Sequence, residues 1–220
     1  MNNQDFAWIA VPDVTPLFRL SINTPEYEFK REVIDAQQID LFNLIDHTLY
    51  NAIDTAVKAN PAQWKQKSYN AGDKVFYDNA YYIANTTTTN APPSSDWDNY
   101  ELMNFYYLYV KKYLAGAAMV RYAPYLGLHL TQWGLEQYNQ EGFGQVSDKR
   151  RGEIVNMIKS KTSVFQTKMF DALSEAKNTF DGVVYGSTSC KSKRKTLPFA
   201  ALGAGKFNNQ PLTHNRREYL

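Results

Sequence analysis

The sequence has few of the residues on which most metal sites and catalytic centres depend. Cys190 is the single cysteine among 220 residues, which excludes an internal disulfide and any zinc site built from several thiolates. The three histidines, His47, His129 and His214, have no further ligand at metal-binding spacing. No nucleophile has a visible base partner. The sequence therefore predicts no catalytic, metal or cofactor residue, and a protein that is not an enzyme.

A secretory signal and a membrane span are also missing from the pattern. The first residues carry Asp5 and no basic start, and no long apolar run precedes a small-residue cleavage site. The longest apolar stretch, residues 100–122, contains Lys111, Lys112 and Arg121, which argues against insertion in a bilayer. We expect a protein that stays in the cytoplasm in which it is made and that has no membrane partner.

Charge is balanced overall and uneven along the chain. The net charge is +2, but from Gly182 onward seven basic residues face one acid, so the preceding part is about −4. A basic tail of this kind can be solvated disorder, a contact for nucleic-acid phosphates, or an arm that docks on a partner. Its apolar residues favour docking. The candidate docking residues are Lys193, Arg194, Lys195, Phe199, Phe207, Arg216, Arg217 and Tyr219.

The stretch 100–122 predicts a central helix that is covered on most sides. Its apolar residues recur at spacings of three and four, and the remaining faces are partly apolar as well. Pro124 and Gly127 end the pattern. The small residues 115–118 mark the place where another backbone could approach most closely, either from this chain or from a neighbouring copy.

Two further helices are expected to cover part of the central helix. The first begins at Thr24-Pro25-Glu26, with the threonine as cap, and continues to about Val57 on a clean apolar stripe. The second runs from about Asp148 to Asn178 with a near-heptad apolar repeat. Residues 2–23 have no sustained period and several large apolar side chains, which predicts an extended arm that packs.

Between these helices the period changes from helical to alternating. Residues 74–77 and 81–84 lie on either side of Asp78-Asn79-Ala80, which predicts a β-hairpin, and residues 86–95 have the composition of a loop. We therefore predict a mainly α fold, a helical bundle with a small β-hairpin insert and extended N- and C-terminal arms. The expected divisions are residues 1–23 (N-terminal arm), 24–62 and 98–181 (helical body), 63–97 (insert) and 182–220 (basic C-terminal arm).

The insert resembles, in the order and spacing of its aromatic residues and glycine, the small chitin- and cellulose-binding modules that accompany bacterial glycoside hydrolases. The residues that carry the resemblance over roughly 35 positions include Trp64, Tyr69, Tyr82 and Trp97. In those modules an exposed tryptophan pair follows the Tyr-x-Ala segment and stacks on sugar, whereas here Asn85-Thr86 takes that place. The four aromatic residues are therefore candidates either for the core of the insert or for sugar stacking.

The helical body resembles the head-tail connector (adaptor) proteins of tailed bacteriophages, especially the ring proteins of crAss-like phages. The resemblance rests on the order and spacing of these segments: Ile34-Asp35-Ala36-Gln37, Leu49-Tyr50, residues 107–118, residues 126–131, Trp133-Gly134-Leu135 and Val146-Ser147-Asp148-Lys149. Adaptors of the simple type have a short connection where this chain has residues 64–97.

The resemblance implies a structural virion protein of the phage neck, made in the host cytoplasm. It implies a homo-oligomeric ring, usually twelvefold, that joins the portal to the tail and lines the channel for genomic DNA during genome ejection. Its partners would be the portal protein and other neck or tail rings, with the C-terminal arm reaching the portal or a neighbouring subunit. Two alternatives remain at this stage: a glycan-binding module acting through the insert, and a DNA-binding protein acting through the tail.

Overall fold

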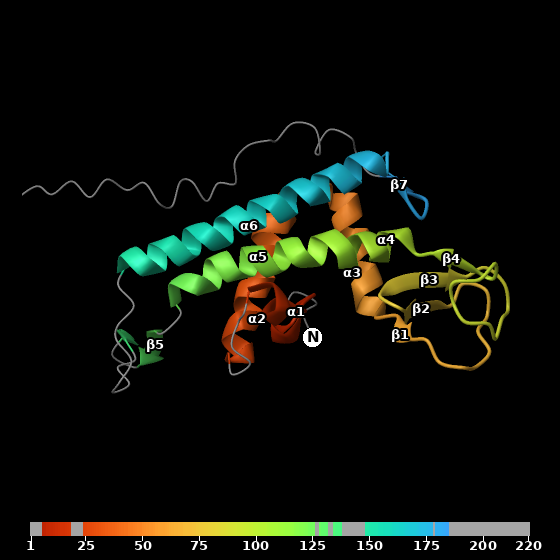
Figure 1. Cartoon of the computed structure of the whole chain (residues 1–220), viewed down its shortest axis with the longest axis horizontal. Helices are drawn as coiled ribbons and strands as arrows, with labels where there is room; N and C mark the ends of the chain where they lie inside the picture. Colours follow the sequence, from red (N-terminus) through yellow and green to blue (C-terminus); the bar gives the residue numbers. More distant parts are fainter. Residues whose placement is uncertain are drawn as a thin grey trace, which may run out of the picture.

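A computed structural model describes residues 6–18, 24–125, 128–131, 134–137, 148–177 and 179–184 (Figure 1). Its helices are α1 (Val11–Phe18), α2 (Glu26–Asp35), the π-helical η2 (Ala36–Leu41), α3 (His47–Ala59), α4 (Glu101–Phe105), the π-helical η3 (Tyr106–Val110), α5 (Lys111–Tyr122), the 3-10 helix η4 (Ala123–Tyr125) and α6 (Asp148–Glu175). Its strands are β1 (Ala62–Gln63), β2 (Lys74–Tyr77), β3 (Ala80–Ala84), β4 (Trp97–Asn99), β5 (Leu128–Thr131), β6 (Gly134–Gln137), β7 (Thr179–Phe180) and β8 (Val183–Val184).

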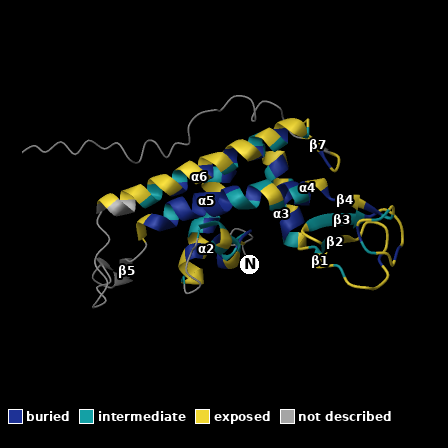
Figure 2. Cartoon of the chain, viewed as in Figure 1, coloured by how far each residue is buried: buried dark blue, intermediate teal, exposed yellow. Residues whose placement is uncertain are grey.

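The central helix consists of α4, η3 and α5, which follow one another with helical backbone angles at both junctions. In Figure 1, α6 lies along one side of it, and α1 and the first turns of α2 lie on the other. Tyr113 and Leu114 are fully buried, and most of α5 is shielded by the chain itself (Figure 2). The prediction of a covered central helix is confirmed. Within the described residues, no helix combines the length and apolarity needed to cross a membrane.

Helix α6 packs along the central helix, as the sequence predicted, although its pattern differs in detail. The buried seam consists of Ile158, Thr162, Gln166, Met169 and Leu173, spaced by three or four residues. Met157 and Val164, which belong to the predicted apolar repeat, are 66% and 51% exposed. The buried seam thus includes the polar Thr162 and Gln166, while the apolar Met157 and Val164 are exposed to solvent.

The prediction of one continuous helix from Pro25 to about Val57 was wrong. The helix begins at Glu26, turns π-helical at Ala36, ends at Leu41, and restarts as α3 at His47. The restart is capped by Asp46, whose Oδ1 accepts a hydrogen bond from Thr48 N at 2.8 Å. The apolar stripe continues through the break, because Leu41, Ile45 and Leu49 are all buried, and so the break left no mark on the periodicity.

The predicted fold class was also wrong. Helices and strands both contribute to the structure, and the insert forms a four-stranded sheet rather than a lone hairpin, so the fold is mixed. The predicted hairpin is its centre: β2 and β3 pair antiparallel around a two-residue turn at Asp78-Asn79, both with positive φ. Strand β1 adds in parallel and β4 antiparallel. These edge strands have two and three residues, which is too short to produce an alternating pattern.

The N-terminal arm packs, as expected, but is not extended throughout. Residues 11–18 form helix α1, and Trp8, Ile9, Val11 and Val14 are buried in the main core. The expected C-terminal arm begins with strand β8, which pairs with β7 across a turn at Asp181-Gly182. Residues 185–220 of that arm lie outside the described residues.

Candidate assembly surfaces

The small residues of the central helix, proposed above as a possible place for a neighbouring copy, are covered within the chain. Residues 115–118 are all buried, and α6 crosses them at Gly116. A Cβ at Gly116 would stand 3.0 Å from Thr162 Cβ and closer still to the threonine hydroxyl oxygen. That hydroxyl donates to Ile158 O at 2.8 Å within its own helix. Glycine at this position therefore lets α6 approach, and the patch is ordinary core.

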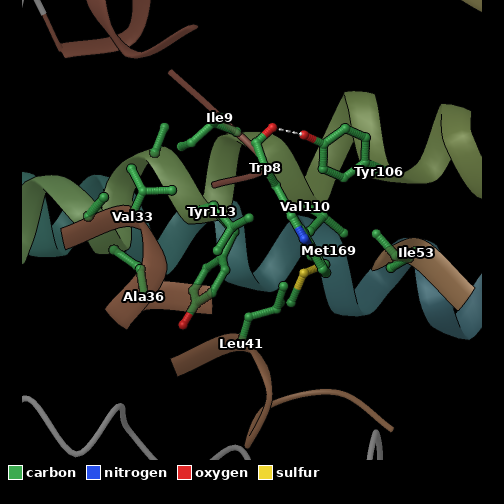
Figure 3. Packing of buried hydrophobic residues seen from close by; sticks show 14 of the residues in the cluster. Trp8, Ile9, Val33, Ala36, Leu41, Ile53, Tyr106, Val110, Tyr113 and Met169 are labelled. Carbon is green, nitrogen blue, oxygen red and sulfur yellow. Dashed lines mark hydrogen bonds between the residues drawn. The ribbon is translucent and has the colours of Figure 1, made fainter. Parts of the chain in front are cut away.

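The N-terminal arm is held by a buried glutamine that binds its backbone. Gln37, on η2, accepts a hydrogen bond from Trp8 N at 2.7 Å and donates one to Phe6 O at 3.0 Å. From η3, the Tyr106 hydroxyl donates to Trp8 O at 2.5 Å (Figure 3). Burial raises the pKa of Tyr106 far above its ordinary value, so this phenol keeps the proton that it donates. The arm is thus fixed through main-chain atoms by both π-helical segments.

Ion pairs also join the central helix to η2 and α1. Asp40 on η2 receives Arg121 Nε at 2.8 Å and Nη2 at 2.9 Å, and this hydrogen bonding raises the pKa of Arg121. Lys111 Nζ lies 2.8 Å from Asp13 of α1. The Tyr113 hydroxyl is buried nearby without a hydrogen-bond partner among the described residues, and burial raises its pKa far above the ordinary value. These pairs fasten the helices to one another.

The β insert is fastened to the central helix by a second amide. Asn104 Oδ1 accepts from Tyr81 N at 2.7 Å, and its Nδ2 donates to Tyr81 O at 3.0 Å. The rings of Phe76, Tyr81 and Tyr107 pack together at the same junction, with centroids 4.8 to 5.9 Å apart. The insert, residues 64–97, is therefore held firmly against the central helix by these hydrogen bonds and ring contacts.

The four aromatic residues proposed for sugar stacking or for the insert core lie together in the insert. Tyr69 and Trp97 are buried with Val75 and Ala84, and Trp64 and Tyr82 pack against them half-buried. Tyr69 OH donates to Lys65 O at 3.0 Å, and Trp97 Nε1 donates to Asn90 O at 2.9 Å. Because their ring faces are used inside the insert, Tyr69 and Trp97 offer no platform to a sugar.

The turn between β7 and β8 caps the N-terminal end of the central helix. Asp181 accepts hydrogen bonds from Glu101 N at 3.2 Å and Leu102 N at 2.7 Å, which satisfies two free amides of the first helical turn. Next to it, the Phe180 ring stacks on Phe105 with centroids 4.8 Å apart. The chain following α6 is therefore anchored to the start of α4.

The remaining sequence-predicted residues fall in different places. The eight docking residues of the basic tail, Cys190 and His214 lie outside the described residues. His47 stacks on Phe42 with ring centroids 4.1 Å apart, as a packing contact. In the described ranges, no group of three or more metal-ligating side chains comes together.

Two exposed regions contain unpaired apolar side chains. On α2, Tyr27 is 87% exposed and has Glu26 and Glu28 beside it. Elsewhere, a groove of about 360 Å³ runs between the central helix and the C-terminal half of α6, and its lining includes Leu108 and Phe165. Leu108 is 44% exposed. A single exposed apolar side chain is ordinary on a protein surface, whereas the groove gathers Leu108, Tyr109 and Phe165 in one place.

The sequence reasoning missed the residues that fasten the parts together. Gln37, Asn104 and Asp181 bind main-chain atoms of distant segments, and nothing in the local pattern distinguishes Asn104 and Asp181 from solvent-exposed polar residues. The one available signal was Gln37 itself, a polar residue in an apolar stripe, which typically indicates a buried hydrogen bond.

Comparison with known proteins places the chain in a family without a described role. The model of DUF6712, a family of unknown function, matches residues 41–193. No curated protein matches the chain. No solved structure matches it either.

Proposed function

We propose that this chain, which belongs to the DUF6712 family, is a structural virion protein of the phage neck. In this proposal it assembles with its own copies into a ring, usually twelvefold in the adaptors that it resembles, which joins the portal to the tail and lines the channel for genomic DNA. The role is structural rather than enzymatic, and the site of action is the virion after synthesis in the host cytoplasm. The resemblance of the helical body to phage adaptors is the starting point of the proposal.

The observation that best supports it is the contrast between a complete core and unpaired apolar surface. The central helix is buried within one chain, so a second copy is not needed for folding. The same body exposes Tyr27, Leu108 and Met157, at 87%, 44% and 66%. Aromatic residues and methionine are enriched in protein–protein interfaces relative to the rest of the surface, which suits Tyr27 and Met157 to a contact between subunits. This arrangement suits subunits that fold first and associate afterwards.

The arms and the charge distribution agree with this role. Because the described part of the N-terminal arm is held on its own body, we assign the portal contact to the basic segment after residue 184. Its positive charge and aromatic residues are suited to an acidic or apolar docking surface on protein, and also to DNA in the channel. Truncation of this segment separates these two possibilities.

The experiment is reconstitution of the full-length chain with and without a portal protein. We expect rings in negative-stain images, or ring-shaped density on the portal, and a matching mass by native mass spectrometry. A version lacking residues 191–220 should still fold, lose portal attachment, and retain its nonspecific DNA binding. A strictly monomeric full-length protein that also ignores the portal would overturn the proposal. If the truncation instead abolishes a steeply salt-dependent DNA affinity and leaves portal attachment intact, the tail is a DNA-binding element.

The glycan-binding alternative loses its main support in this geometry, because two of its four aromatic residues are buried. A pulldown on chitin, cellulose and bacterial capsule should show no retention. Trp97→Ala should leave that result unchanged while it destabilises the insert. Retention that depends on Trp64 or Tyr82, which are half-buried, would restore the alternative.

A further inference from the structure

Tyr27 is the most exposed large apolar side chain in the described part of the chain, at 87%. It lies in the first turn of α2, where Glu26 and Glu28 are its neighbours, and Lys30 and Arg31 follow one turn later. All five side chains are exposed. The feature is therefore a projecting aromatic ring with one acidic residue on each flank and two basic residues one helical turn further along α2.

The groove between the central helix and α6 has the complementary features. Its lining includes the apolar side chains of Leu108 and Phe165, and its volume is about 360 Å³. The charged residues of the groove have the opposite signs to those around Tyr27. Lys112 and Lys168 are basic, and the acidic Asp171 and Glu175 lie one to two turns beyond Lys168 along α6. An apolar pocket with such a rim fits an aromatic anchor whose flanking charges have the opposite signs.

These two surfaces lie apart in one copy and cannot meet within it. In Figure 1 the first turn of α2 is on the side of the central helix away from α6, while the groove is formed by α6 itself. The high exposure of Tyr27 agrees with this separation. Contact between them requires two copies, and the contact is heterologous because different surfaces meet. Repetition of a heterologous contact produces a ring when the rotation closes.

We infer that the first turn of α2 of one copy inserts Tyr27 into the groove between the central helix and α6 of the next copy. This inference rests on the proposed function, since it names the surface through which the ring closes. Glu26 and Glu28 then face Lys112 and Lys168, and Lys30 and Arg31 face Asp171 and Glu175. Burial of the tyrosine ring removes about 150–250 Å² of surface from solvent. Val164 and Met157 extend the contact along the outer face of α6.

The test uses two variants that block opposite sides of the contact. Tyr27→Asp blocks the projecting side and Leu108→Asp blocks the groove, and both positions are exposed enough for the fold to tolerate the change. Each variant alone should be monomeric under conditions in which the unmodified chain forms rings, with or without portal. An equimolar mixture should give a 1:1 dimer and nothing larger, because one intact contact remains. Val184→Asp, at a position 71% exposed on β8, is the matched control and should assemble normally.

Charge reversal gives a second readout. Lys168→Glu should lower ring formation at least about tenfold at low salt, and adding Glu28→Lys to the same chain should restore much of it. If the unmodified chain forms rings while both blocked variants also form them, the inferred interface is wrong and the proposed function stands. If the unmodified chain forms no ring even on the portal, the proposed function fails, and the inference fails with it. A mixture of the blocked variants that stays monomeric also overturns the heterologous contact.

Discussion

The N-terminal arm and the β insert are attached to the helical body in the same way but depend on it to different degrees. Gln37 binds the backbone of the arm and Asn104 binds the backbone of the insert, each through a side-chain amide. The arm adds Trp8, Ile9 and Val14 to the main core, whereas the insert has a core of its own around Trp97. The arm therefore belongs to the folding unit of the body, while the insert is a small unit with its own core that is fixed to the body.

Removing the indole that the arm buries should have the largest effect. Trp8 is 6% exposed, packs against Tyr50 and Tyr106, and donates from Nε1 to Asp54 at 3.0 Å. Trp8→Ala should reduce the free energy of unfolding of the whole body by about 3–5 kcal/mol. Denaturant unfolding followed by circular dichroism measures it. A loss of less than about 1 kcal/mol would mean that the arm is not part of the core.

Replacing the arm's amide should have the next largest effect. Gln37→Leu keeps a similar volume and leaves Trp8 N and Phe6 O without their partner. Each unpaired group costs about 1–3 kcal/mol when it is buried and less where solvent reaches it, so we expect a loss of about 2–3 kcal/mol in global stability. Gln66→Leu, the same substitution at an exposed position, is the matched control. Equal effects of the two variants would contradict the role given to Gln37.

Replacing the insert's amide should have a local effect. Asn104→Leu leaves Tyr81 N unpaired, while Tyr81 O still accepts from Tyr100 N at 2.9 Å. Hydrogen exchange should speed up in β2 and β3, and global unfolding should change by less than about 1 kcal/mol because the body keeps its own core. Cooperative loss of the whole body in this variant would show that the two regions do not differ in the way described.

The smallest effect concerns the insert at acid pH. Hydrogen bonds from Thr88 and Asn90, at 2.7 Å each, lower the pKa of Asp96 below its ordinary value of 3.8. The stabilisation is therefore present above that value and is lost as the pH falls through the lower pKa of the folded state. Protection of the amides of residues 85–97 from hydrogen exchange should decline in that acid range, before the helical body unfolds. Asp96→Asn should remove this pH dependence, and an unchanged profile would count against it.

The sequence predicted elements whose residues repeat over several turns or alternate over several positions. Residues 100–122 and the seam of α6 are long enough to show a helical period, and the hairpin around Asp78-Asn79 has both alternation and turn residues. The break between Leu41 and His47 was missed because buried residues keep the stripe across it. The edge strands β1 and β4 were missed because pairing with a neighbour, rather than local pattern, defines them.

The candidate surfaces could be predicted less well than the fold. The exposure of Tyr27 and Met157 depends on which side of each helix the rest of the chain covers. A helical pattern shows how apolar residues repeat, but it does not show which other segment covers them. Met157 and Ile158 looked equivalent in the repeat, yet one is 66% and the other 4% exposed. The docking residues in the tail remain a prediction.

The anchoring of Asp181 and Phe180 at the start of α4 determines how mechanical load would pass through the subunit. Tension applied to the chain after residue 184 would first act on the β7–β8 turn, which is held by Glu101 N, Leu102 N and the Phe105 ring. The load would then enter the central helix at its N-terminus, in parallel with the packed length of α6, rather than peel α6 away one turn at a time. A subunit pulled by its C-terminal segment would therefore resist as a whole.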